Sequence, residues 1–277
     1  MGIPMPFEVQ TLGEWERAGV PGLLSVVIPA HNEQGHIRET VEGIVHALSG
    51  ASIRHEILVV NDNSQDRTET ILTLLAARYP TVRYINNDVP NGFGYAVRRG
   101  LAEFRGDAVA IMMADGSDSP DDLVAFYQRL NEGYDCVFGS RFMRGAHTVD
   151  YPFLKLIFNR MGNKLIQVLF RLSCNDISNA FKLYRRHVIA GLQPILACQF
   201  NLTVELPLKA VVRGYRYAVL PNSWTNRKQG VSKFKIREMG SRYFFILLYC
   251  LLEKYLERGD LRSSPEMRAT QLQVWHR

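Results

Sequence analysis

The chain has 277 residues, of which 47% are apolar and 22% are charged, and its formal net charge is +6. This composition supplies enough apolar material for a buried core and excludes a globally disordered chain. The four cysteines, Cys136, Cys174, Cys198 and Cys250, have neither a paired spacing nor a metal-ligand spacing, and the N-terminus lacks an apolar signal-peptide core. We therefore expect reduced thiols and a cytoplasmic location.

Short apolar runs alternate with helical patterns from residue 23 to residue 140, after a proline-containing lead-in at 1–22. Strands are predicted at 24–28, 56–60, 82–85, 108–112 and 136–138. Helices are predicted between them at 33–48, 66–78, 94–104 and 120–132. This alternation is typical of an α/β fold, a Rossmann-like and mostly parallel sheet with helices on both faces.

The pattern is less regular after residue 140. Helices are predicted at 151–172, 203–213 and 236–258, and strands at 181–184 and 215–220. We therefore divide the rest of the chain into a second half of the same domain at 141–234, a C-terminal helix at 235–258 and a mobile tail at 259–277.

The second half of the chain is also basic. Between residues 141 and 186 nine basic residues stand against two acidic ones, Asp150 and Asp176. This imbalance indicates either a solvated basic face, or an anionic substrate or membrane surface beside it. The longest apolar run, at 243–252, is shorter than the ~20 residues that span a bilayer. We expect this helix to be buried or to contact a membrane peripherally.

Polar residues follow four of the predicted strands, in the segments 29–33, 61–66, 114–118 and 139–141. Ligands of open α/β sheets bind beyond the carboxyl ends of the strands. In any one segment these residues are equally explained as helix caps, but their convergence on one edge favours a ligand site. The chain has no Gly-x-Gly-x-x-Gly after its first strand and no P-loop, which argues against a dinucleotide enzyme and a P-loop NTPase.

The polar segments, in their order, resemble family 2 glycosyltransferases of the GT-A fold, and most closely the dolichol-phosphate and polyprenyl-phosphate mannosyl- and glucosyltransferases. The resemblance covers residues 23–254. It is carried by VVIPAHNE (26–33), VVNDNSQDRT (59–68), NGFGYAVRRG (91–100), MADGSDSPDD (113–122), GSRF (139–142), NRMGNKL (159–165), NDISNAFKLYRR (175–186), FNLTVELPLKAVVRGY (200–215) and NRKQGVSKFK (226–235). It implies a nucleotide-sugar-binding half at 23–140 and an acceptor-side half at 141–234.

The same resemblance implies which residues bind the donor. They are Pro29, Ala30, Asn32, Glu33, Asp62, Gly92, Ala114, Asp115, Arg227, Ser232 and Lys233. Glu33 and Asp62 are expected to hold the base and ribose by accepting hydrogen bonds. Arg227, Ser232 and Lys233, together with Arg141 of the Gly-Ser-Arg segment, are expected to bind phosphates.

One departure from the family pattern concerns the metal. Met113 stands where relatives have the first acidic residue of an Asp-x-Asp motif, so that Asp115 is the remaining carboxylate of the pair. The resemblance implies that Asp115 binds Mg²⁺ or Mn²⁺, and Asp118 is a candidate for compensating the loss. One carboxylate is compatible with Mg²⁺, which fills its other positions with phosphates and waters.

The implied activity is an inverting transfer of a hexose from a nucleotide-diphosphate sugar of the GDP-mannose or UDP-glucose type, with Asp115, Arg141, Asp176 and Glu205 as catalytic candidates. The implied acceptor is a polyprenyl or dolichyl phosphate at the inner membrane surface. Such a phosphate is already anionic, and Arg141 with Lys155 and Arg160 would orient it. A hydroxyl acceptor, soluble or on a glycan, would need a base, either Asp176 or Glu205. In the alternative interpretation Asp176 closes a turn and Glu205 caps a helix.

Other functions remain as alternatives. A non-catalytic nucleotide-sugar-binding protein is favoured by Met113. A nucleotidyltransferase would need a glycine-rich loop with a lysine where this chain has residues 29–33. A nucleic-acid-binding module is disfavoured because the basic segments lack interleaved aromatic residues.

Overall fold

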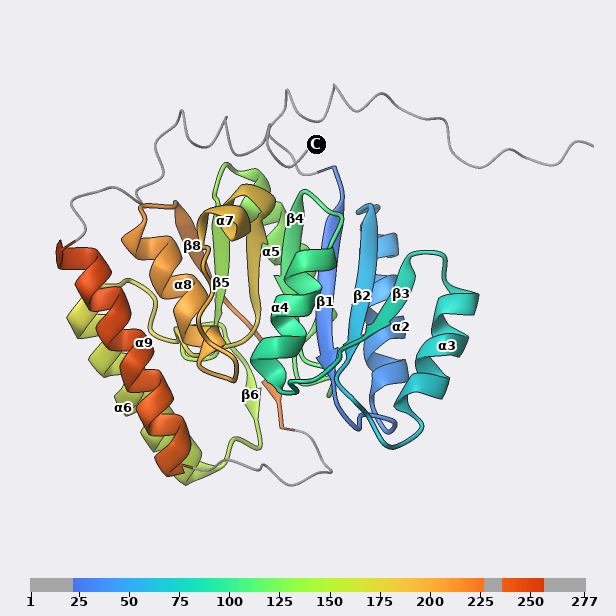
Figure 1. The fold of residues 1–277 in the computed structure, drawn as a ribbon. Helices are drawn as coiled ribbons and strands as arrows, with labels where there is room; N and C mark the ends of the chain where they lie inside the picture. The colour runs from blue at the N-terminus through green and yellow to red at the C-terminus, as the bar shows by residue number, and fades with distance from the viewer. Residues whose placement is uncertain (1–21, 227–235, 257–277) are drawn as a thin grey trace, which may run out of the picture.

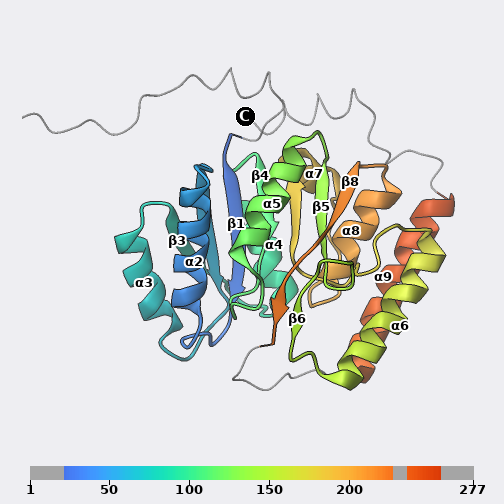
Figure 2. The same ribbon diagram turned by 180° about the vertical axis from the view of Figure 1, so that it is seen from behind.

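The computed structural model describes residues 22–226 and 236–256 as a sheet covered by helices on both faces (Figures 1 and 2). Outside the described residues lie positions 1–21 of the predicted lead-in, the predicted tail at 259–277, and the candidate phosphate ligands Arg227, Ser232 and Lys233.

The main sheet has the strand order β3-β2-β1-β4-β7-β5-β8. Its strands are β1 (Leu24–Ala30), β2 (His55–Asn61), β3 (Val82–Asn86), β4 (Ala108–Ile111), β5 (Cys136–Ser140), β7 (Lys182–Arg185) and β8 (Tyr217–Pro221). Neighbouring strands are parallel except where β7 pairs with β4 and β5. The predicted mostly parallel sheet is therefore confirmed. The sequence did not indicate the small second sheet of β6 (Thr148–Val149) and β9 (Trp224–Thr225).

The helices bury two separate apolar layers against the sheet, because successive strand residues face opposite sides. Val26 and Ile28 pack under α2 (Ile37–Gly50), α3 (Thr68–Arg78) and α5 (Pro120–Asn131). Val27, between them, belongs to the layer on the other face. That layer is completed by α4 (Phe93–Glu103), α6 (Phe153–Phe170), α7 (Arg186–Gly191), α8 (Leu202–Val212) and α9 (Ile236–Leu256).

Helix α2 begins at Ile37, four residues later than predicted. The cause lies in the backbone N–H groups of the preceding loop, which bond to side chains of the segment after β2. Glu33 N donates to Thr68 Oγ1 at 2.9 Å, and Gln34 N donates to Asp66 Oδ2 at 3.1 Å. These bonds hold the two strand-end loops together and leave the helix to start after them.

Helices α6 and α9 lie side by side at the edge of the molecule next to β8 and α8 (Figures 1 and 2). Lys254 of α9 donates to the carbonyl of Phe170 at the end of α6 at 3.0 Å. No helix in the described residues combines the length and apolar character needed to cross a bilayer.

Gly94 allows the first turn of α4 to lie directly against the backbone of the loop at 196–201, where an added Cβ would clash with Cys198 and Gln199. Gly162 in α6 has no atom within 4 Å of such a Cβ. We predict that Gly94→Ala lowers the free energy of unfolding by about 1–3 kcal/mol through overpacking. Gly162→Ala should raise it by up to about 1 kcal/mol, because alanine is the better helix former. Urea denaturation of both variants tests this contact, and equal effects would contradict it.

Candidate active site

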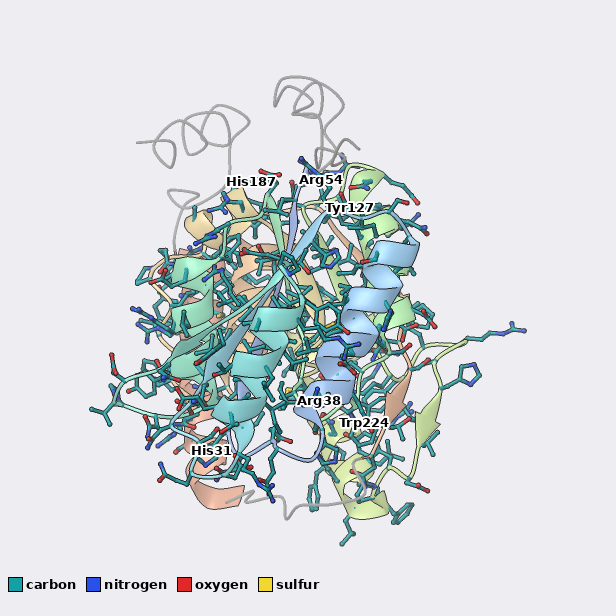
Figure 3. All side chains as sticks on the ribbon, turned by 90° about the vertical axis from the view of Figure 1, so that its right-hand side faces the viewer. His31, Arg38, Arg54, Tyr127, His187 and Trp224 are labelled. Carbon is teal, nitrogen blue, oxygen red and sulfur yellow. The ribbon has the colours of Figure 1, made fainter. Side chains whose placement is uncertain are left out.

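The parallel strands β1, β2, β4 and β5 end on one side of the molecule, where the predicted site residues gather. The ends of β1, β2 and β3 are in register, with Ala30 opposite Asn61 and Asn61 opposite Asn86. His31 and Trp224 lie at this end, whereas His187, which follows the antiparallel β7, lies at the opposite end (Figure 3).

The loops after β1 and β2 form one hydrogen-bonded unit. Asp62 N donates to the carbonyl of Ala30 at 2.8 Å, and Asn32 Oδ1 accepts from Gln65 N at 2.7 Å. Asn32 and Asn63 both have positive φ, a conformation that asparagine tolerates better than most residues. Pro29 and Ala30, which were also predicted to bind the donor, are buried at the end of β1. The predicted donor-binding residues of both loops are thus brought together.

Asp62 organises the glycine-containing loop that leads into α4. Its side chain is buried, with Oδ1 accepting from Asn87 Nδ2 at 2.7 Å and Oδ2 accepting from Gly92 N at 2.8 Å. Gly92 has a φ of 140° and lies against the side chain of Gln199, where a Cβ would clash. The contact of Asp62 with a base or ribose remains a prediction.

The turn after β4 brings Asp115 and Asp118 close together. Asp115 Oδ1 accepts from Ser117 N at 3.1 Å, and Asp118 Oδ2 accepts from Met113 N at 3.4 Å. The carbonyl of Ala114 accepts a hydrogen bond from Thr40 of α2 at 2.9 Å. The alternative interpretation of the polar segment at 114–118 as a helix cap would make Asp118 the N-cap of α5. Asp118 does not have that role in the structure. Ser119 occupies the N-cap position, without a side-chain capping bond.

The two carboxylates fit a divalent cation. Burial, and after it the nearby charge of Asp115, together raise the pKa of Asp118 to about 7. A cation would relieve that repulsion, and Mg²⁺ commonly uses one or two protein carboxylates and fills its other positions with phosphate and water oxygens. Residues 22–226 and 236–256 contain no group of three or more His, Cys, Asp or Glu side chains that could hold a metal ion by itself. Asp115 and Asp118 would therefore share the cation with the substrate.

Arg141 and Asp176 form a buried ion pair beyond the end of β5. Arg141 Nε donates to Asp176 Oδ2 at 2.7 Å, and Nη2 donates to Oδ1 at 2.8 Å. The two side chains are 9% and 0% exposed. Burial alone would lower the pKa of Arg141, but the charge and hydrogen bonds of Asp176 outweigh it and raise the pKa above its ordinary value. Arg141 is therefore a permanent cation, and Asp176 is the group that holds it.

The other candidate cations, Lys155 and Arg160, are gathered around Arg141 by aromatic rings. Arg141 and Arg160 both lie over Phe142, at 5.5 and 5.2 Å from the ring centre. Arg141 and Lys155 both lie over Tyr151, at 5.6 and 5.8 Å. Three positive side chains thus share one small region at the start of α6, which suits a phosphate group.

Glu205 is not free to serve as the predicted base. It is fully buried in the first turn of α8, and its carboxylate accepts from Leu196 N at 2.8 Å and Ala197 N at 2.6 Å. Lys209 Nζ lies 2.6 Å from Glu205 Oε1 and also donates to the carbonyl of Pro194. These contacts make Glu205 an anchor for the loop before α8 rather than a base that is free to accept a proton.

Sequence reasoning gave no role to Lys182, which the antiparallel strand β7 places between the two halves of the site. Its side chain is buried and donates to the carbonyl of Thr203 at 3.3 Å. Burial lowers its pKa to about 8, an effect that the negative charges of Asp176 and Asp118 oppose. The sequence does not reveal this position, because basic residues such as Lys182 and Arg185 at the ends of a short strand are also typical of exposed edge strands.

A cavity of about 480 Å³ opens between α4, the loop at 196–201 and the N-terminal part of α9. Both polar and apolar residues line it: Tyr95, Leu196, Cys198, Gln199, Asn201, Ser241, Arg242 and Phe245. None of the predicted site residues that the structure describes lines this cavity, and the described ones meet instead at the open edge of the sheet.

The family of the chain follows from its sequence match. The model of glycosyl transferase family 2 matches residues 25–192, which include the loops after β1, β2, β4 and β5. The chain belongs to glycosyltransferase family 2. It is accordingly a glycosyltransferase.

Two relatives illustrate the branch. The polyprenol monophosphomannose synthase of Mycolicibacterium smegmatis is 29% identical over 233 residues, covering 78% of this chain and 86% of the relative. The dolichol-phosphate mannosyltransferase of Pyrococcus furiosus is 30% identical over 217 residues, covering 76% of this chain but 59% of the relative. The predicted resemblance to lipid-phosphate glycosyltransferases is confirmed.

Solved structures confirm the GT-A fold. The glucosyl-3-phosphoglycerate synthase of Mycobacterium tuberculosis, in complex with Mn²⁺ and UDP-glucose, superposes with a TM-score of 0.64 at 20% identity. The match covers 88% of this chain and 83% of the synthase. At this identity the likeness extends to the fold alone.

The raised pKa of Asp118 makes the stability of the protein depend on pH. An unfolded aspartate loses its proton near 3.8, whereas Asp118 in the fold keeps it to about 7. Stability is therefore lost progressively between pH 4 and 7, and the loss is complete above 7. We predict that Asp118→Asn, without added metal, raises the melting temperature more at pH 8 than at pH 5. Asp121→Asn, an exposed change in the same segment, is the control, and equal shifts at both pH values would refute the assignment.

Proposed function

We propose that this glycosyltransferase moves a hexose from a nucleotide-diphosphate sugar, with inversion, to a polyprenyl phosphate at the cytoplasmic surface of a membrane. In this reaction an oxygen of the acceptor phosphate attacks the anomeric carbon. The bond from that carbon to the donor diphosphate breaks, and the nucleoside diphosphate leaves with the electron pair.

One observation carries the choice of a phosphate over a hydroxyl acceptor. Both predicted bases, Asp176 and Glu205, are fully buried and each is paired with a cation. A hydroxyl nucleophile needs a base to remove its proton, whereas a phosphate oxygen is already anionic. A site whose candidate bases are engaged therefore favours an acceptor that needs none.

Arg141 is the residue we assign to the acceptor phosphate. A guanidinium has five N–H donors. In the described part of the chain Asp176 takes two of them, and Tyr151 takes one at 3.5 Å. The remaining donors on Nη1 and Nη2 suit a phosphate, with Lys155 and Arg160 adding positive charge. The buried Lys182 adds positive charge close enough to interact with both members of the ion pair.

Asp115, with Asp118, is assigned to a Mg²⁺ or Mn²⁺ ion. When bound, such an ion neutralises charge that develops on the departing diphosphate. The loops after β1 and β2, with Glu33 and Asp62, are assigned to the nucleoside. The names of the relatives favour a mannosyl donor, whereas the M. tuberculosis synthase was solved with UDP-glucose. Both GDP-mannose and UDP-glucose therefore enter the test.

The apolar surface of α6 and α9 supports contact with a membrane. Of the 17 large apolar side chains that are exposed in the described residues, seven lie on α6 and six on α9. Helix α6 carries Lys155, Arg160 and Lys164 and no acidic residue. Exposed apolar side chains beside basic ones are typical of helices that lie in the interface of an anionic bilayer. The acceptor's lipid chain and its phosphate would then meet α6 and Arg141, respectively.

Labelled sugar transfer tests the proposed function. We expect transfer from one donor, GDP-mannose or UDP-glucose, to polyprenyl phosphate but not to polyprenol, which offers a hydroxyl instead. Asp115→Asn should reduce the rate at least about 100-fold, since it removes electrostatic stabilisation of the leaving group. Transfer to polyprenol would contradict the phosphate assignment. Binding of a nucleotide sugar without transfer to either acceptor would favour the non-catalytic alternative.

Vesicle sedimentation tests the membrane surface. Leu165 on α6 and Leu74 on α3 are 56% and 55% exposed, so they form a matched pair. We predict that Leu165→Glu weakens binding to vesicles of phosphatidylcholine and phosphatidylglycerol about tenfold, because roughly 1.4 kcal/mol is lost with one apolar side chain. Leu74→Glu should leave binding unchanged. The membrane proposal fails if the two variants bind alike.

A further inference from the structure

Two asparagines, Asn159 and Asn163, lie one turn apart on the inner side of α6, the helix whose outer side carries exposed apolar residues. Asn163 is 3% exposed. Its Oδ1 accepts from Ser178 N at 3.0 Å, which fixes the orientation of the amide. A buried amide in a surface helix is costly unless its partners are satisfied, so those partners indicate what the residue does.

The partners of Asn163 lead to the Arg141–Asp176 ion pair. Asn163 Nδ2 lies 2.8 Å from Asn159 Oδ1, 2.9 Å from the carbonyl oxygen of Asn159, 2.9 Å from Ser178 Oγ and 3.4 Å from Asp176 Oδ1. Asp176 Oδ1 is the oxygen that also accepts from Arg141 Nη2. Asn163 of α6 and Arg141, which follows β5, therefore contact the same carboxylate oxygen of Asp176.

Asn159 provides a second hydrogen-bonded connection between α6 and Arg141. Its Oδ1 accepts from Ser178 Oγ at 2.7 Å, and its Nδ2 donates to Tyr151 Oη at 2.6 Å. Tyr151 Oη in turn accepts from Arg141 Nη1 at 3.5 Å. Arg141 is thus linked to α6 along two routes, one through Asp176 and one through Tyr151.

We propose that Asn163 is a positioning residue, which couples helix α6 to the Arg141 guanidinium by holding Asp176 in place. The inference rests on the proposed function, because it assigns Arg141 to the acceptor phosphate. The helix that contacts the lipid surface and the cation that receives the lipid's phosphate then keep a fixed relative position. The contacts that hold Arg141 indirectly matter because a small displacement of a group that binds the substrate can greatly reduce the reaction rate.

The test variant is Asn163→Asp, which keeps the shape and the oxygen that accepts from Ser178 N. Its ionised carboxylate would repel Asp176, whereas its protonated form can still donate. Burial and Asp176 should raise the pKa of the new carboxyl group. The other ionisable groups of the packed elements around the ion pair include Lys155 and Arg160, which share aromatic rings with Arg141, and Asp118, Tyr151, Cys174, Lys182 and Tyr243.

We expect the acceptor KM of Asn163→Asp to lie within about twofold of the wild-type value at pH 5.5 and to exceed it at least about tenfold at pH 8.5. The donor KM should not change. Asn163→Ala, which introduces no charge, should raise the acceptor KM equally at both pH values. Gln167→Glu makes the same amide-to-acid change one turn further along α6, beside Lys164, and should match the wild type.

A wild-type acceptor KM for Asn163→Asp at pH 8.5, or an equal rise in both KM values, would overturn the inference. If the wild type transfers no sugar to polyprenyl phosphate, the proposed function fails, and hydrogen exchange then tests the coupling alone. The amide N–H of Arg141 donates to Asp176 Oδ2 at 3.0 Å and reports on this contact. It should exchange faster in Asn163→Asp than in Gln167→Glu at pH 8.5, and equal exchange would reject the coupling.

Discussion

The buried ion pair between Arg141 and Asp176 is the interaction on which the proposed acceptor site of this enzyme depends. It joins the end of β5 to the segment before β7, and its two side chains are 9% and 0% exposed. Removing one member of such a pair strands a buried charge and typically costs about 3–5 kcal/mol. The pair also decides the chemistry of the site, because a carboxylate that holds a guanidinium on both oxygens is an anchor rather than a base. The acceptor is then expected to bring its own negative charge.

The sheet separates the opposite charges of the site. Asp115 and Asp118 follow β4, Arg141 follows β5, and β7 runs between these strands in the opposite direction. Because β7 is antiparallel, it places the buried Lys182 near both groups, where Asp176 and Asp118 oppose the lowering of its pKa by burial. A cation on the acidic side and a phosphate on the basic side would lie next to each other, as transfer between a diphosphate sugar and a lipid phosphate requires.

The sequence was sufficient for much of the fold and for part of the site. The pattern of apolar residues located the strands. The polar segments after β1, β2, β4 and β5 converge as predicted, because parallel strands end at one edge of the sheet. It was not sufficient for Asp176 and Glu205, because whether a carboxylate is a base or an anchor depends on its partners in the fold. Arg141 is distant from Asp176 in the sequence, and Lys209 is close to Glu205 in the sequence but is buried with it only in the folded chain. The orientation of β7, and with it the place of Lys182, likewise depends on tertiary pairing. The predicted ligands at 227–233 lie outside the described residues and remain predictions.

The central claim is that Arg141, held from behind by Asp176, receives the acceptor phosphate. A crystal structure with a short-chain polyprenyl phosphate tests it most directly. We predict a phosphate oxygen at ~3 Å from Nη1 or Nη2 of Arg141, with Asp176 still bonded to the opposite edge of the guanidinium. A phosphate bound elsewhere, or an Asp176 turned away from Arg141 toward the acceptor, would contradict it.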